Sequence, residues 1–207
     1  MNREGRVAIF SLKTMLHFAA LCPLLWLIFA INNQLLGADP AKDIQHFTGI
    51  TALRLLLVIS LIPMLAYFLR LNILFQTRKL LGLWCFFWAL LHLCSYLFLE
   101  IGWDNLSLFF SEVFSRVYLV IGAICWLSLF LMAISSFNGV RIRLGHWWKR
   151  IHTLLYPTML LVILHYILSM KTMTPEPVLY FIMVSAAIFY RYKNIMAKMI
   201  APLYKKI

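Results

Sequence analysis

The sequence lacks the short motifs that mark many soluble enzymes. It contains no P-loop, no dinucleotide-binding glycine fingerprint, no nucleophile elbow and no HEXXH zinc motif, which excludes the common nucleotide-binding and hydrolytic machinery. Its four cysteines lie singly inside apolar runs, so no pair has the spacing of a metal or thiol redox site. We interpret these cysteines as small buried residues.

Acidic residues and polar linkers are also scarce. Seven Asp and Glu stand against 19 Lys and Arg in 207 residues, and the net charge is +12. No low-complexity linker divides the chain and no segment has room for an extramembrane domain, so we expect a single domain over residues 1–207. Any soluble cofactor domain must then belong to another protein.

Hydrophobic residues make up 63% of the chain, which excludes an ordinary soluble domain. Apolar runs of membrane-spanning length predict an all-α bundle of six transmembrane helices. The first run is too long for a signal-peptide core and no cleavage site follows it, so we expect a permanent span. The predicted spans are about 10–31, 49–69, 79–99, 116–136, 150–170 and 177–196.

The basic residues gather on one side of this predicted bundle. Fifteen of the 19 Lys and Arg fall on the side of both chain ends, together with one acid, whereas the other side has four basic and six acidic residues. By the positive-inside rule, both termini are cytoplasmic. Because topology explains the positive charge, that charge does not indicate a nucleic-acid partner, and the expected surroundings are membrane lipid.

Histidines inside the predicted spans are the main functional signal, because ionisable side chains at membrane depth are costly. His92 is ~20 Å along the third span and His165 is ~24 Å along the fifth, measured from their cytoplasmic ends. The two imidazoles therefore reach a similar depth in the outer half and suit the two axial positions of one haem iron. The alternative is that neighbouring hydroxyl groups, such as those of Ser95 and Tyr166, satisfy these histidines.

His152 lies near the cytoplasmic face and has no histidine partner on the third span. Arg78 is at the matching depth, as a ligand or as a partner of the propionates of a second haem. An ideal helix would turn His152 and His165 ~140° apart. We therefore predict a kink or π-bulge at Pro157, which would rotate His165 back towards the third span. A partly solvated interfacial histidine without haem is the alternative for His152.

Two further polar residues lie at the outer end of the second span. Arg54 either neutralises haem propionates or snorkels to the lipid headgroups. His46 either contacts a periplasmic partner or a quinone headgroup, or belongs to an ordinary loop cap. His17, in the inner half of the first span, is interpreted as a packed or interfacial histidine, with a role near an inner cofactor as the alternative.

Three blocks of sequence resemble the MsrQ (YedZ) family: GADPAKDIQHFTG from residue 37, RKLLGLWCFFWALLHLCSY from residue 78, and LGHWWKRIHTLLYPTMLLVILHY from residue 144. The blocks are in order, and the resemblance covers essentially the whole chain. It implies a six-helix, ferric-reductase-like domain of a bacterial inner membrane that binds b-type haem through His92, His152 and His165. The wider ferric-reductase pattern has two histidines on each of two helices. The third span here has only His92, so one haem or two stays open.

The resemblance also implies an electron-transfer function. In that family the subunit passes electrons, attributed to the respiratory quinone pool, to MsrP, a periplasmic molybdopterin enzyme that reduces methionine sulfoxide in oxidised envelope proteins. FMN is among the family's cofactors. Neither FMN nor quinone has a motif in these residues, so both expectations depend on the resemblance, and a cytoplasmic flavin donor is the alternative source of electrons. No residue set for the sulfoxide chemistry is present.

Two other functions stay open at this point. A stand-alone ferric or cupric reductase would use the same haem without a protein acceptor. A proton or metal-ion transporter would use the buried histidines as a pathway, usually with inverted repeats and broken midplane helices. The sequence shows no convincing internal repeat.

Overall fold

The structure is a computed structural model that describes residues 3–170 and 174–204, with side chains as far as residue 193. The part of the chain that it describes is helical and contains no strand. In chain order the elements are α1 (Arg3–Asn32), α2 (Pro40–Phe68), the 3₁₀ helix η1 (Asn72–Thr77), α3 (Arg78–Ser95), the π-helical η2 (Tyr96–Ile101), α4 (Leu106–Ser115), α5 (Val117–Ser135), α6 (Asn138–Leu144), α7 (Trp147–Thr153), α8 (Leu155–Ser169) and α9 (Pro175–Tyr204).

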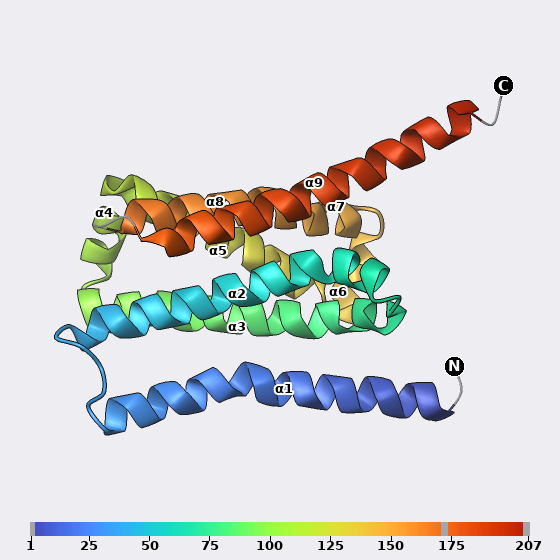
Figure 1. The fold of residues 1–207 in the computed structure, drawn as a ribbon. Helices are drawn as coiled ribbons and strands as arrows, with labels where there is room; N and C mark the ends of the chain where they lie inside the picture. Colours follow the sequence, from blue (N-terminus) through green and yellow to red (C-terminus); the bar gives the residue numbers. More distant parts are fainter. Residues whose placement is uncertain (1–2, 171–173, 205–207) are drawn as a thin grey trace.

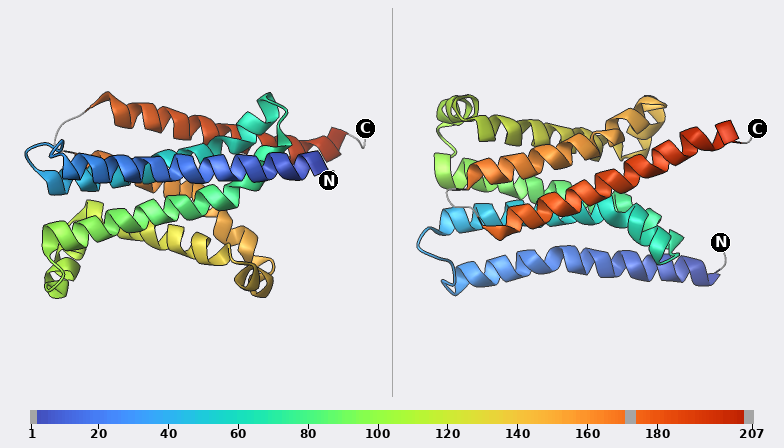
Figure 2. Two further views of the ribbon diagram at one scale, coloured as in Figure 1. Left: turned by 90° about the horizontal axis from the view of Figure 1, so that it is seen from below. Right: turned by 45° about the horizontal axis from the view of Figure 1, so that its top comes forward.

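Four helices form the centre of the bundle. α2 pairs with α3, α5 pairs with α8, and α3 contacts α5 to join the two pairs. Figures 1 and 2 show α1 along one side of this group and α9 along another, with the start of α1 and the end of α9 at the same end of the bundle. The α9 helix contacts α2 and α8.

Within the residues that the structure describes, five segments are long and apolar enough to cross a membrane: α1, α2, the η1–α3–η2 segment Asn72–Ile101, α5, and the α7–α8 segment Trp147–Ser169. They coincide with the first five predicted spans. The sixth predicted span, 177–196, falls in α9, which is not among the five, and its last residues lie beyond the described side chains. The short helices α4 and α6 were not predicted.

The central position of α2 is visible in its burial. Half of its most apolar window is buried, against 17% for α1. The start of α2 follows directly from the sequence, because Asp39 caps the helix by accepting from the backbone N–H of Lys42, and Pro40 suits the first turn.

Two α3 tryptophans hold α1: Trp84 donates to His17 Nδ1 at 3.0 Å and Trp88 donates to the Ala20 carbonyl at 3.1 Å.

The predicted kink in the fifth span is confirmed as a break between α7 and α8 at Leu154. Pro157 has no backbone N–H to bond to the Thr153 carbonyl, so a hydrogen bond of a continuous helix is missing at this turn. The Leu154 N–H donates instead to the Ile151 carbonyl at 3.0 Å. The Leu154 carbonyl accepts from the Thr158 N–H at 2.9 Å, which begins α8. Pro157 thus lies in the first turn of α8, where a missing donor costs least.

Candidate functional site

His92 on α3 and His165 on α8 face one another at the α4 end of the bundle, as their similar predicted depth required. Their ring centres are 6.2 Å apart and their planes are inclined by 81°. An imidazole nitrogen lies about 1.2 Å from its ring centre and binds a metal at ~2.0–2.1 Å. Two imidazoles on opposite sides of one ion therefore have ring centres ~6.4–6.6 Å apart, only a few tenths of an ångström more than in this pair, which thus has about the spacing of two ligands to one iron.

Backbone carbonyls fix the orientation of both rings. Nδ1 of His92 lies 2.9 Å from the Gln45 carbonyl oxygen on α2, and Nδ1 of His165 lies 2.7 Å from the Tyr118 carbonyl oxygen on α5. Because a carbonyl can only accept, each Nδ1 carries the proton and each Nε2 keeps its lone pair. This is the arrangement by which proteins orient a histidine for metal binding.

Two glycines leave the space in which these rings lie. A Cβ on Gly49 would be 3.0 Å from Cε1 of His92, and a Cβ on Gly122 would be 2.8 Å from Cε1 of His165. A larger residue at Gly122 would displace the imidazole of His165, and one at Gly49 would require the His92 ring to shift by a few tenths of an ångström. The absence of a side chain at each position is therefore part of the site.

The two histidines line a cavity of about 570 Å³ with mostly apolar walls, called here the outer cavity. A porphyrin is a flat, mainly apolar group with polar edges, and apolar pockets with a few polar groups suit such ligands. Two buried N–H donors of the lining, Gln45 Nε2 and Trp126 Nε1, have no hydrogen-bond partner in the structure. An unpaired buried donor costs ~1–3 kcal/mol. The residues present therefore fit a haem that brings its own acceptors.

A second cavity of about 580 Å³ lies at the other end of the bundle, around His152 of α7, and is called here the inner cavity. His152 Nδ1 lies 3.1 Å from the Trp148 carbonyl oxygen, and its Nε2 lies 3.4 Å from the Ser136 hydroxyl. Arg78 lines the same cavity, as its predicted depth required. Two further unpaired buried N–H donors, Arg78 Nε and Trp148 Nε1, belong to this lining.

The inner cavity is strongly cationic. No acidic residue is among those that line it, and its basic residues are Arg78, Lys79, Arg141, Lys149 and Arg191. Three of the guanidinium groups lie over aromatic rings of the same lining: Arg78 over Phe75 at 4.7 Å, Arg141 over Trp148 at 4.7 Å, and Arg191 over Tyr156 at 5.7 Å. Rings position these cations without neutralising them. The cavity therefore suits an anionic ligand with an aromatic body.

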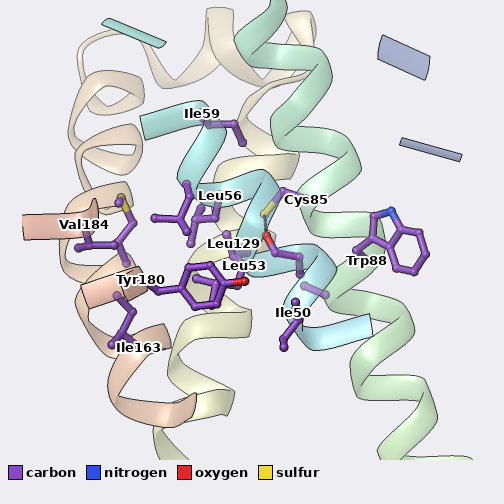
Figure 3. Close-up of a cluster of buried hydrophobic side chains, with 14 of the residues drawn as sticks. Ile50, Leu53, Leu56, Ile59, Cys85, Trp88, Leu129, Ile163, Tyr180 and Val184 are labelled. Carbon is purple, nitrogen blue, oxygen red and sulfur yellow. Dashed lines mark hydrogen bonds between the residues drawn. The ribbon is translucent and has the colours of Figure 1, made fainter. Parts of the chain in front are cut away.

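A single layer of side chains separates the two cavities. Leu56, Cys85 and Leu129 line both of them and are at most 9% exposed. Figure 3 shows these three residues together within the buried hydrophobic cluster. Ligands in the two cavities would therefore be near neighbours.

The remaining predicted residues have different positions. His46 lines the outer cavity, and its Nε2 is 3.5 Å from the Tyr166 hydroxyl. Arg54 does not line either cavity, because its side chain is turned to Tyr180, whose hydroxyl accepts from Nε at 3.0 Å. His17 also lies outside both linings, beside Trp84. Of these three residues, the structure brings only His46 to a cavity.

Sequence reasoning missed the residues that position the imidazoles. Gly49 and Gly122 stand in the runs FTGIT and VIGAI, where a glycine inside an apolar helix is the only available signal. No sequence pattern marks the carbonyls of Gln45 and Tyr118, because every residue has a backbone carbonyl. Trp126 resembled an ordinary membrane tryptophan, and only its unpaired N–H at the cavity marks it.

Comparisons with known proteins show the family to which the chain belongs. Residues 47–163 match the model of the family described as "Ferric reductase like transmembrane component". The chain is also 47% identical over 184 residues to the "Protein-methionine-sulfoxide reductase heme-binding subunit MsrQ" of Cronobacter sakazakii, covering 89% of this chain and 92% of that one. Proteins of the same name from Pectobacterium carotovorum and Salmonella paratyphi B are 46% and 47% identical over 183 residues, which are 88% of this chain and 92% of each relative.

The fold, the paired histidines and the match over residues 47–163 define a multi-pass, ferric-reductase-like membrane protein. Within that class, the chain belongs to the MsrQ family of haem-binding subunits, as the resemblance of its three sequence blocks indicated.

Proposed function

We propose that this chain is the b-type haem membrane subunit of a methionine sulfoxide reductase system and that it transfers electrons across the membrane. The observation that carries the proposal is the spacing of His92 and His165, whose ring centres are 6.2 Å apart with both Nδ1 atoms held by carbonyls. The sulfoxide chemistry itself belongs to the partner, because neither cavity offers a residue set for it.

A haem bound in the outer cavity supplies a one-electron carrier. His92 and His165 would both hold the iron, and a haem held by two imidazoles would favour electron transfer over binding of oxygen or substrate. The work of the chain is to hold the two imidazoles in place and to keep water away with apolar walls. The hydrogen bonds from Nδ1 to the carbonyls raise the basicity of the imidazoles, which would also adjust the reduction potential of the bound haem.

The inner cavity is proposed to hold the second cofactor, either another haem or FMN. For a haem, His152 is an iron ligand and Arg78 is a second ligand or a partner of the propionates. For FMN, the same cations bind the phosphate and the aromatic rings stack on the flavin. Leu56, Cys85 and Leu129 line both cavities, which supports direct electron transfer between the two cofactors.

The direction of transfer follows from the proposed topology. Six spans with both termini in the cytoplasm place the cationic inner cavity at the cytoplasmic side of a bacterial inner membrane, because that cavity lies at the end where α1 begins. The respiratory quinone pool, or a cytoplasmic flavin donor, supplies electrons. The outer site delivers them to a periplasmic, MsrP-like molybdopterin subunit that repairs oxidised proteins, and His46 is in place to contact that partner or a quinone headgroup.

The first expected result concerns the purified protein in detergent. It should have the Soret and α bands of b-type haem, and both bands should change on reduction with dithionite. The reduced protein should be reoxidised faster by the purified periplasmic subunit than by chelated ferric or cupric ion. A colourless protein that does not take up haem would overturn the proposal and leave the transporter as the better explanation.

The family description favours one second candidate, a stand-alone ferric or cupric reductase. It would use the same two histidines and would need no protein acceptor. The reoxidation experiment separates the two functions, because preference for the chelated metal over the periplasmic subunit would assign the chain to the reductase class.

A further inference from the structure

The first helix lies at the edge of the bundle, and most of its surface faces outward. Figure 1 shows α1 alongside α3, and α1 contacts α3 and η1. Only 17% of its most apolar window is buried, so hydrocarbon surrounds most of this helix in a membrane. Its outward-facing side chains include a polar one, the exposed imidazole of His17, which lies outside both cavities.

His17 is too deep in the predicted span to reach water easily. The span begins at about residue 10, and the helix rises ~10 Å from there to His17. Lys13, one turn earlier, can extend its long side chain to the headgroups, but an imidazole has no such reach. Ionisable residues within spans usually face the bundle interior or a water-filled cavity, and they mark functional sites. A lipid-facing histidine at this depth therefore needs a hydrogen-bond partner from the bilayer.

The hydrogen bond from Trp84 determines which polar atom His17 presents to the bilayer. Trp84 Nε1 donates to His17 Nδ1 at 3.0 Å. Because an indole N–H can only donate, Nδ1 has the lone pair, and the proton of the neutral imidazole lies on Nε2. Within the described residues, this N–H has no hydrogen-bond acceptor. Since an unpaired N–H in hydrocarbon is costly, a ligand that fits here must bring an acceptor oxygen.

Aromatic rings of α3 continue the same surface. The His17 and Trp84 rings meet edge to face with their centres 5.8 Å apart, and the Trp84 and Phe87 rings do the same at 5.3 Å. Trp84 and Phe87 are only partly buried. Rings in this arrangement suit a flat apolar ligand, which packs against their edges and faces. The group formed by His17, Trp84 and Phe87 is called here the lipid-facing site.

The lipid-facing site is also close to both cavities. Trp84 directly precedes Cys85, which lines the outer and the inner cavity. A helix with its side chains is ~10–12 Å wide, so a ring beside Trp84 is about one helix width from the cavities. A redox-active ligand at this place therefore lies near the cofactors that the cavities are proposed to hold.

These contacts define the chemistry of the ligand. It has an oxygen that accepts from His17 Nε2, a flat ring that packs against aromatic side chains, and an apolar body that dissolves in the bilayer. A quinone with an isoprenoid tail has all three properties. Phospholipid ester carbonyls also accept hydrogen bonds, but they lie at the boundary of the hydrocarbon core, ~10 Å nearer to the headgroups than His17. The depth of His17 therefore favours a quinone over a lipid.

We propose that the lipid-facing site binds the ring of a membrane-dissolved quinone, with His17 Nε2 donating to one quinone oxygen and the tail remaining in the lipid. Trp84 positions the imidazole by its bond to Nδ1. This inference rests on the proposed function, because it gives a place to the quinone that supplies electrons there. The site lies on α1 and α3 in the inner half of the membrane, whereas His46 belongs to the outer cavity.

Binding of an oxidised quinone tests the proposal without electron transfer. Tritiated decylubiquinone is added to the haem-loaded protein in phosphatidylcholine nanodiscs, and the amount taken up by empty nanodiscs is subtracted. His17→Phe keeps a ring but has no N–H, so the dissociation constant should rise ~10-fold, as expected for one lost hydrogen bond. His17→Gln keeps an N–H donor and should stay within ~3-fold of the wild type.

Two further variants complete the experiment. Trp84→Phe leaves α1 unchanged but removes the indole N–H, so the imidazole proton can move to Nδ1, and quinone affinity should fall ~3-fold or more. Phe29→Leu is the matched control, because it removes another exposed ring of α1, ~18 Å along the helix from His17, and should leave quinone affinity unchanged. The haem bands of each sample report on folding, since none of these substitutions touches His92 or His165.

Two outcomes would overturn the proposal. The first is wild-type quinone affinity in both His17→Phe and Trp84→Phe, because His17 would then face only lipid or water. The second is a haem-loaded wild type that binds no quinone above the level of empty nanodiscs, which would leave the cytoplasmic flavin donor as the source of electrons. A wild type without haem bands would instead contradict the proposed function, so the two failures are distinguishable.

Discussion

Replacing His92 or His165 by alanine should remove haem from the outer cavity. Each imidazole has its Nδ1 bonded to a carbonyl and its Nε2 available, and the ring centres are 6.2 Å apart, so each ring would supply one nitrogen to an iron held between them. Changes in the groups that only support a metal ligand cost 10–100-fold in affinity, and loss of the ligand itself should exceed ~100-fold. Titration of the purified apoprotein with haem, followed at the Soret band, measures the effect.

Two other histidines provide the controls. His146→Ala removes an exposed ring on the connector between α6 and α7 that contacts only Trp147 among the ring contacts found, so haem binding should be unchanged. His152→Ala should reduce binding at the inner cavity and leave the outer bis-imidazole spectrum intact. Wild-type haem affinity in both His92→Ala and His165→Ala would show that the two imidazoles are not the ligands.

Hydrophobic length, helix-breaking chemistry and depth were enough to predict most of this arrangement. Five predicted spans coincide with helices, and Pro157 predicted the break between α7 and α8 because a missing N–H acts locally. The meeting of His92 and His165 followed from the constant rise of a helix. Each of these features depends on a property of a single segment of the chain, namely its hydrophobic length, its proline or its rise per residue.

Features that depend on the contact between two helices were not predictable in the same way. The space for the rings at Gly49 and Gly122 exists only once each helix faces its partner. Arg54 was expected to contact either haem propionates or lipid headgroups, whereas its Nε donates to the Tyr180 hydroxyl, 126 positions away.

The clearance at the two glycines gives the second large expected effect. Gly122→Ala would place a Cβ 2.8 Å from Cε1 and 3.0 Å from Nδ1 of His165. The ring cannot retreat freely, because its Nδ1 is held 2.7 Å from the Tyr118 carbonyl oxygen on the same helix as the glycine. The imidazole must therefore tilt or give up that bond, and either change misaligns Nε2. We expect haem affinity at the outer site to fall ~10–100-fold, as for other losses of support to a metal ligand.

Gly49→Ala should act in the same direction but less strongly, because its Cβ would be 3.0 Å from Cε1 of His92. Gly82→Ala is the matched control: it lies on α3, no atom is within 4 Å of its added Cβ, and the exchange should stabilise the helix by ~0.5–1 kcal/mol.

Thermal unfolding of the three apoproteins separates positioning from folding. If Gly122→Ala binds haem as tightly as Gly82→Ala does, the glycine is not needed to place the imidazole. If its apoprotein melts far below the control, its role is in packing. We expect Gly122→Ala to have a normal melting temperature and weakened haem binding. In that case the alanine changes the orientation of the His165 ring but not the association of α5 with α8.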